Sequence, residues 1–345
     1  MKTFAFAFIF VVLVNKFCAA ASGNTSGSGI LLEDIGAKGG GLFGACSSFT
    51  GDITLLRYNP AGITDLNAAQ LSAFYYNSGT TGINYGSITY GQNIGAGVIG
   101  LNISYLNGGD MELNLINGTT ANVISEQDIS GSVSLGVPLG KKLSIGASIK
   151  ALSSTLIGAK TAIAFAGDAG AVYKGFILEQ LNIGAAILNL GTGLKYLDTA
   201  EALPLIVQGG ASYRIPWLAE DLTVILSADG VYGVNDKIFG LKAGVEGNYK
   251  EFSARIGIPL GLSEDTSFTA GAGYRLEGQY LFDYAVSFGK ALGLTHRVSV
   301  GMLFGEKNED NYRSNTLQKK QNQNNDNYRG NTPPKKQNWN NKVIK

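Results

Sequence analysis

The chain has 345 residues, of which 48 are glycine, seven are proline, two are cysteine and one is histidine. So few cysteines and histidines exclude a metal cluster built from these ligands, and abundant glycine with scarce proline favours paired strands and tight turns over a disordered coil. The net charge of +1 combines an acidic body, residues 21–304 with 22 acidic and 16 basic side chains, and a basic tail, residues 305–345 with four acidic and nine basic ones.

Residues 1–21 have the pattern of a secretory signal peptide. A lysine stands near the start, an apolar run of eleven residues follows from Phe4 to Val14, and small residues suited to cleavage come last. The run is too short to span a bilayer as a helix. Cys18 would suit a lipoprotein signal, but Phe17 stands where a small residue is expected. After cleavage only Cys46 remains, so we expect no internal disulfide and a buried thiol at that position.

Residues 22–65 form a distinct N-terminal segment. It contains a glycine run at Gly39, Gly40 and Gly41, and it ends in Asn59-Pro60-Ala61-Gly62. Pro60 favours an extended Asn59, whose side chain is expected to cap the following turn, and Gly62 is expected to take a positive φ to reverse the chain. These four residues are predicted to anchor the segment. A direct contact with a ligand is the alternative.

Alternating apolar and polar residues predict fourteen strands after residue 65. Most are nine to twelve residues long, which is the length that a tilted strand needs to cross a bilayer. No stretch of 18 apolar residues follows residue 21, so helical spans are excluded. The predicted strands cover residues 68–77, 83–91, 95–106, 127–138, 142–153, 164–174, 180–190, 204–215, 221–231, 238–248, 251–260, 267–276, 279–288 and 295–304.

The hairpin at residues 128–151 shows the alternation most clearly. Ile145 and Ile149 lie on one face of its second strand, and Ser148 and Lys150 lie on the other. A barrel of fourteen strands is too wide for an apolar lining to fill, so the apolar face is expected to meet lipid. The fold class predicted is therefore an all-β, antiparallel transmembrane barrel, with residues 66–304 as its wall. A soluble β-sandwich is the alternative, although it explains the strand lengths less well.

The opposite face of the strands carries most of the charged side chains. On this parity they are predicted to face the lumen and to form ion pairs, with Asp283 between Arg275 and Arg297 as one ladder. The predicted lumenal charges are Lys150, Arg214, Lys242, Glu246, Arg255, Arg275, Asp283 and Arg297.

The last forty-one residues differ from the barrel. Residues 310–325 and 326–341 are a tandem repeat of sixteen residues, dominated by Asn, Gln and Lys. With hardly any aliphatic residues, residues 305–345 are predicted to be disordered. Phe304 then ends the barrel and is the predicted signal for the barrel assembly machinery. An even number of strands places both termini on one side, which is expected to be the periplasm.

Two features that suggest catalysis or cofactor binding have simpler interpretations. Gly39, Gly41 and Gly44 have the spacing of a dinucleotide-binding loop, but they lie outside any strand–helix unit. His296 shares the lipid-facing parity of the last strand, where it cannot activate a lumenal serine. We therefore expect no enzyme, no cofactor, no metal and no nucleic-acid partner.

The glycine run, the acidic Asp52, and Asn59-Pro60-Ala61-Gly62 before the first long strand resemble the start of the PorV/PorQ family. That family belongs to the wider group of FadL-like outer-membrane barrels. The resemblance implies fourteen strands and an N-terminal plug folded into the lumen. Lys38 stands where the family usually has arginine, and residues 305–345 have no counterpart.

The resemblance leaves two functions open for a bacterial outer-membrane protein. A PorV/PorQ-like barrel would receive secreted cargo proteins at the cell surface. A FadL-like barrel would bind a hydrophobic solute at its plug and pass it inward, or sideways through the wall. The expected partners are outer-membrane lipid, the assembly machinery, and either cargo or such a solute.

Overall fold

A computed structural model describes residues 28–305, except 80, 117, 158–159, 217, 219–220, 261–265 and 291–292. The predicted signal peptide, the repeat-containing tail from residue 306, and the first residues of the N-terminal segment lie outside the described residues. In the described part, no helix is long and apolar enough to cross a membrane.

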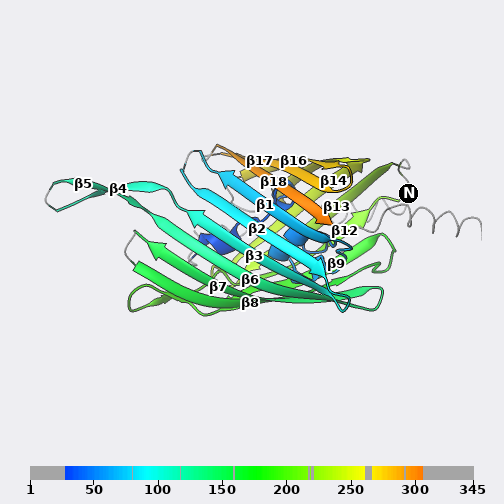
Figure 1. Cartoon of the computed structure of the whole chain (residues 1–345), viewed down its shortest axis with the longest axis horizontal. Helices are drawn as coiled ribbons and strands as arrows, with labels where there is room; N and C mark the ends of the chain where they lie inside the picture. Colours follow the sequence, from blue (N-terminus) through cyan, green and yellow to red (C-terminus); the bar gives the residue numbers. More distant parts are fainter. Residues whose placement is uncertain are drawn as a thin grey trace, which may run out of the picture. The chain divides into compact units, whose positions relative to one another are not determined.

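Fourteen antiparallel strands form one closed barrel, in which the first strand pairs with the last (Figure 1). Each coincides with a predicted strand to within a few residues, so the predicted fold class is confirmed. The barrel strands are β1 (Ala69–Asn77), β2 (Asn84–Asn93), β3 (Val98–Asn107), β6 (Glu126–Leu139), β7 (Leu143–Leu156), β8 (Lys160–Tyr173), β9 (Leu181–Gly191), β12 (Ile206–Arg214), β13 (Leu222–Gly233), β14 (Ile238–Tyr249), β15 (Phe252–Leu260), β16 (Thr266–Leu276), β17 (Tyr280–Gly289) and β18 (Leu294–Phe304).

The apolar face of the strands points outward, as the alternation predicts. In β7, Ile145 is 40% exposed and Ile149 is 71% exposed, whereas Ser144 and Ser148 are buried. The inward hydroxyls pair with one another across strands, as in the 2.8 Å hydrogen bond from Ser134 to Ser148. The wall therefore presents an apolar surface to lipid and a polar surface to the lumen.

The two ends of the barrel differ. At one end, called the turn end here, short connections such as residues 94–97 and 140–142 join the strands. At the other, called the loop end, residues 108–125 and 192–205 make the longest connections. Both lie outside the predicted strands, but each contains a hairpin: β4 (Asp110–Asn114) with β5 (Thr120–Ile124), and β10 (Leu194–Lys195) with β11 (Ala200–Glu201). Figure 1 shows the β4–β5 hairpin extending beyond the neighbouring strands.

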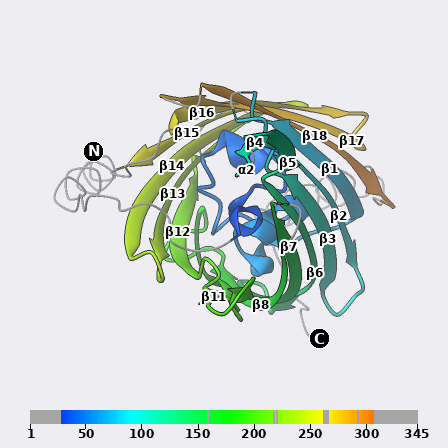
Figure 2. The same ribbon diagram turned by 90° about the vertical axis from the view of Figure 1, so that its left-hand side faces the viewer.

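Residues 28–68, called the lumenal segment below, lie inside the ring of strands (Figure 2). They form one short α-helix and three 3-10 helices joined by turns, and most of their side chains are buried. Main-chain groups of the segment bond directly to inward-facing wall residues, as from the Ala37 N–H to Ser299 and from Thr269 to the Gly41 carbonyl. The elements are η2 (Gly29–Leu32), α2 (Ala37–Gly41), η3 (Ile53–Arg57) and η4 (Pro60–Ile63).

Two rows of inward-facing wall glycines allow the segment to approach the wall. Under η4 the row is Gly136, Gly146 and Gly170, which pair in register across β6, β7 and β8. Under α2 and the turn after it lie Gly244, Gly257 and Gly271. A Cβ atom on Gly146 would stand 2.3 Å from the Pro60 carbonyl carbon, and one on Gly257 would stand 2.3 Å from that of Leu42. Part of the high glycine content is thus explained by close main-chain contact in the lumen.

Candidate functional site

The Asn59-Pro60-Ala61-Gly62 turn joins the lumenal segment to the wall. Asn59 is fully buried and extended, and its side-chain oxygen accepts a 3.0 Å hydrogen bond from the Ala61 N–H, as the capping prediction requires. Its side-chain nitrogen donates to the carbonyls of Ser47, Ala171 and Ala185 at 2.7, 3.1 and 3.3 Å. One amide therefore links the segment to itself and to strands β8 and β9.

The prediction of a positive φ at Gly62 is wrong. Gly62 lies within η4, and the residues with positive φ in the described chain do not include it. Glycine is needed for space instead, since a Cβ atom there would stand 2.9 Å from both the Leu55 Cβ and the Phe49 carbonyl oxygen. Pro60 is the first residue of η4, a position where its fixed φ suits the helix and its missing N–H is not needed.

A buried ion-pair network faces α2. Arg255 bonds Glu246 through its Nε at 2.7 Å and Asp283 through its Nη1, and the Arg255 and Glu246 side chains are each only 5% exposed. Gly273 leaves the space in which Arg255 reaches across β16 to Asp283. Buried charges of this kind need every partner, so the network fixes the geometry of this part of the wall.

Lys38 of α2 adds a charge from the lumenal segment. Its ammonium lies 3.4 Å from the Asp52 carboxylate. Burial disfavours the ionised carboxylate, but Lys38 and the hydrogen bonds from the Thr54 N–H and hydroxyl outweigh it and lower the pKa of Asp52. The basic residue next to the glycine run thus helps to hold the segment together. Gly39, Gly40 and Gly41 lie within α2 and are buried.

The other predicted lumenal charges differ in their burial and in their partners. Lys150 bridges Asp168 at 2.8 Å and Asn189 at 2.7 Å on the far side of the lumen. Arg214 and Arg275 have inward parity but are exposed, because they stand at the turn-end limits of β12 and β16. The predicted ladder of Asp283 with Arg275 and Arg297 does not form: Asp283 pairs with Arg255, and Arg297 lies 3.6 Å from Asp34.

A β-bulge in β9 lies beside Lys150. The pairing of β8 with β9 shifts between Gly167 and Ala169, and Asn189 takes a φ of 61°. Two successive residues, Leu188 and Asn189, therefore face inward and are buried. The Asn189 N–H donates to Asp168 at 2.8 Å. The bulge re-aims a polar side chain into the lumen, a role in which β-bulges are common.

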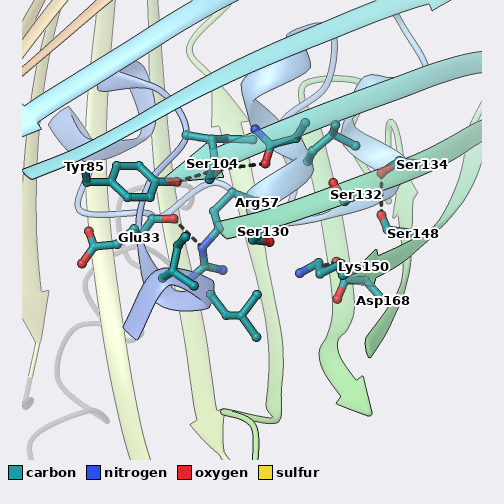
Figure 3. A pocket seen from close by; sticks show the side chains of 15 residues that line it. Glu33, Arg57, Tyr85, Ser104, Ser130, Ser132, Ser134, Ser148, Lys150 and Asp168 are labelled. Carbon is teal, nitrogen blue, oxygen red and sulfur yellow. Dashed lines mark hydrogen bonds and ion pairs between the residues drawn. The ribbon is translucent and has the colours of Figure 1, made fainter. Parts of the chain in front are cut away.

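A small polar cavity lies between the lumenal segment and strands β2, β3, β6, β7 and β8 (Figure 3). Its volume is ≈ 40 Å³, which is room for a few water molecules. Glu33 and Arg57 of the segment lie on one side of it, and Ser148, Lys150 and Asp168 of the wall lie on the other (Figure 3). Arg57 donates from Nε to the Glu33 carbonyl at 2.9 Å and from Nη2 to that of Leu32 at 2.8 Å.

An apolar cluster closes the lumen toward the loop end. Ile30 and Leu31 of η2 pack among aromatic and aliphatic side chains that point inward near the ends of β1, β2, β3, β7 and β8, and Leu194 and Leu203 of the 192–205 connection join them. Tyr85 is 1% exposed within this cluster and stacks on Tyr76 at 5.5 Å between ring centroids. This is an apolar environment inside a barrel whose inner wall is otherwise rich in serine, threonine and charge.

The outer face of the same wall is hollowed. A groove of ≈ 760 Å³ crosses β3, β6, β7, β8 and β9, with Ile103, Ile149 and Phe165 among the apolar residues that line it. Asn102, Ser132 and Lys150 line both this groove and the small polar cavity. At this place one layer of strands alone separates the lipid face from the lumen.

Several residues of the lumen were not anticipated as site residues. Glu33, Asp34 and Arg57 belong to the segment, and the partners of Asp34 and Arg57 are Arg297 of the wall, the Tyr58 hydroxyl and main-chain carbonyls, which only the folded chain brings near. Cys46 is fully buried among Leu42 and its neighbours, as expected. His296 is exposed on the outer face, beside Tyr284. In the described residues no group of three or more metal-binding side chains is suitably placed.

A scan against protein-family models and a search of curated proteins found no match. Solved structures do resemble the barrel. The toluene transporter TbuX of Ralstonia pickettii matches with a TM-score of 0.57 and 14% identity over 79% of this chain and 99% of that chain. The toluene transporter TodX of Pseudomonas putida matches with a TM-score of 0.53 and 13% identity over 79% and 97%. A FadL homologue of Pseudomonas aeruginosa matches with a TM-score of 0.45 and 12% identity over 80% and 99%.

At these identities the first two matches show the fold alone. They confirm the barrel fold expected from the sequence, whereas membership of the PorV/PorQ family stays a prediction. The chain forms a closed antiparallel β-barrel of fourteen strands around a lumenal segment, with the fold of these two toluene transporters.

Proposed function

We propose that the barrel is a passive, non-enzymatic transporter of small hydrophobic molecules across the outer membrane. The observation that carries this proposal is the apolar cluster around Ile30, Leu31 and Tyr85 at the loop end of the lumen. A water-filled pore has no need of such a cluster, but an apolar solute gains about 25 cal/mol for each Å² of surface that it buries there.

The lumenal segment acts as the plug of this transporter. In the structure Ile30 and Leu31 fill the apolar cluster, and they also line the polar cavity of ≈ 40 Å³. A solute that displaces these two side chains would replace one apolar contact by another, so the free-energy change of this exchange would be small. The thin wall between the lumen and the outer groove offers a sideways exit into lipid, and the segment offers the inward one.

The orientation follows the usual pattern of such barrels. We propose that the loop end faces the outside, where a solute arrives, and that the turn end and both termini face the periplasm. Phe304, the last residue of β18, stands where the assembly machinery would read the final strand.

Uptake of a monoaromatic hydrocarbon by intact cells tests the proposal. Cells that produce the barrel should take up labelled toluene at low concentration faster than cells without it, and the rate should saturate. Changing both Leu106 and Leu152, two wall side chains of the cluster that the solute would contact, to serine should return uptake close to background. The matched control is Ile256→Ser, on the outer face of β15 away from the outer groove, which should leave uptake unchanged at equal barrel content. Equal uptake with and without the barrel would rule out this function.

A role in secretion, as the resemblance to PorV and PorQ suggests, is the second candidate. It is favoured by the β4–β5 hairpin, which extends past the barrel and exposes Met111, Leu115 and Ile116. These exposed apolar side chains would give an exported protein a surface to bind outside the barrel. Deleting residues 110–124 should then abolish copurification of exported cargo while toluene uptake persists; cargo that still copurifies would count against the hairpin as the platform.

A further inference from the structure

A second cavity lies on the other side of the lumenal segment, against strands β12, β13, β14, β16, β17 and β18. Its volume is ≈ 180 Å³. Thr266 and Ile206, which line it, are the first residues of β16 and β12, so the cavity lies in the half of the barrel near the loop end. Unlike the apolar cluster, it is lined mainly by polar and charged groups.

The side chains that line this cavity carry more positive than negative charge, although the Glu33 carboxylate lies near Arg57 and Arg297. Arg57, Lys242 and Arg297 line it, and Asp34 is the one carboxylate among its lining residues. Asp34 is itself held by the Tyr58 hydroxyl and lies 3.6 Å from Arg297 Nε. Asp229 lies opposite Lys242 in the strand register and attracts its charge, but it accepts a hydrogen bond from the Ser47 N–H and does not line the cavity. Three cations against one carboxylate leave the lining with a net charge of +2.

Donors of all three cations remain unused. Lys242 Nζ lies 5.7 Å from the centroid of the Phe43 ring, and no ion pair or hydrogen bond engages it within the described residues. Arg297 donates from Nη1 to Ser287, but its Nε is buried and makes no hydrogen bond to the described residues. Arg57 uses two of its five N–H groups on main-chain carbonyls. Arg297 Nε is buried without a hydrogen bond, although Asp34 lies 3.6 Å from it, and Lys242 is half-buried. An acceptor in the cavity would satisfy both groups.

We propose that this cavity binds an oxyanion of the phosphate or sulfate type. Two guanidinium groups match the oxygens of a tetrahedral oxyanion, which they can bond in pairs, and an ammonium adds a compact third charge. A charge near −2 neutralises the lining. The volume admits such an ion with part of its hydration shell. The oxyanion is either free in solution or the head group of a lipid-like molecule, and the proposal does not depend on the transport of apolar solutes.

Equilibrium dialysis of the full-length folded barrel with labelled inorganic phosphate tests the proposal at low ionic strength. About one saturable site per barrel is expected. Lys242→Gln removes one charge-assisted contact and should weaken phosphate binding by about ten-fold or more. Arg297→Gln should weaken it as well. Arg214→Gln is the matched control: this arginine also has inward parity, but it is exposed at the turn end, and phosphate binding should not change.

Competition distinguishes the two sources of the oxyanion. Inorganic sulfate and butyl phosphate are each added against labelled phosphate. Displacement by sulfate and butyl phosphate alike indicates a free ion, and displacement by butyl phosphate at much lower concentration indicates an amphiphilic head group. The shift to the unfolded band on heating in detergent gels confirms that each variant is folded. Absence of saturable phosphate binding, or equal binding by the folded Lys242→Gln variant, overturns the proposal.

Discussion

Replacing Gly146 with valine is expected to open the barrel to ions. A Cβ atom at this position would stand 2.3 Å from the Pro60 carbonyl carbon and 2.4 Å from the Ala61 nitrogen, and neither main-chain atom can rotate away. The strand itself accepts valine readily. We therefore expect the wall to close while η4 is displaced and Asn59 loses its wall contacts. Single-channel conductance in planar bilayers should rise several-fold, because fourteen strands enclose a wide lumen once the segment leaves it.

Gly131→Val is the matched control for this experiment. Gly131 lies on β6 and faces outward, and the nearest atom to a Cβ there is the Asn102 carbonyl oxygen at 4.0 Å. Its conductance should equal that of the unaltered protein. A second readout is proteolysis, since a displaced segment should be cut when a protease reaches the lumen. An unaltered conductance together with an uncut segment in Gly146→Val would show that η4 does not depend on the glycine row.

Replacing Arg255 with methionine is expected to cause the largest loss of stability among single changes in the wall. The substitution keeps most of the side-chain volume but leaves Glu246 buried and Asp283 largely buried without their shared partner. Removal of one member of a buried ion pair costs about 3–5 kcal/mol, because the remaining charge is desolvated and uncompensated. Urea unfolding of the barrel in lipid vesicles should show this as a lower free energy of unfolding.

The control for Arg255 is Arg275 on the next strand. Both have inward parity, but Arg275 is exposed at the turn end, where water screens its charge. Arg275→Met should change the free energy of unfolding far less than Arg255→Met. If the two variants unfold alike, the network is not a source of stability. Arg255→Met combined with Glu246→Gln should recover part of the loss, since it removes one of the two uncompensated charges.

The wall could be predicted from the sequence because lipid and water impose their pattern on every strand separately. Ile149 and Ser148 differ in exposure because successive side chains of a strand face lipid and lumen in turn, and the same holds for every strand of the barrel. An alternation with a period of two and a strand length set by the bilayer are therefore enough to predict the wall. The β4–β5 hairpin was missed because it lies beyond the barrel, where neither face is buried against lipid or lumen and the alternation loses its meaning.

The lumen could be predicted only in part because its contacts join distant parts of the chain. The capping role of Asn59 is local and was foreseen, whereas its bonds to Ala171 and Ala185 depend on how the segment meets the wall. Arg255 reaches Asp283 across a strand because Gly273 has no side chain. The alternation of inward and outward residues predicts that both charges face the lumen, but it does not predict which charges pair. The role of Gly62 was predicted wrongly, because glycine is needed there for lack of space for a Cβ atom and not for a positive φ.

The two glycine rows also limit how this barrel can be re-engineered. The wall positions under η4 and α2 are moulded to one particular backbone path, since their missing side chains are the space that the path occupies. A lumenal segment grafted from another barrel of the same fold would find glycines where it does not approach the wall and side chains where its main chain has to lie close to the wall. Exchanging the lumenal segment therefore requires exchanging the wall residues beneath it at the same time. A library of lumen variants has to vary the segment and these wall residues together.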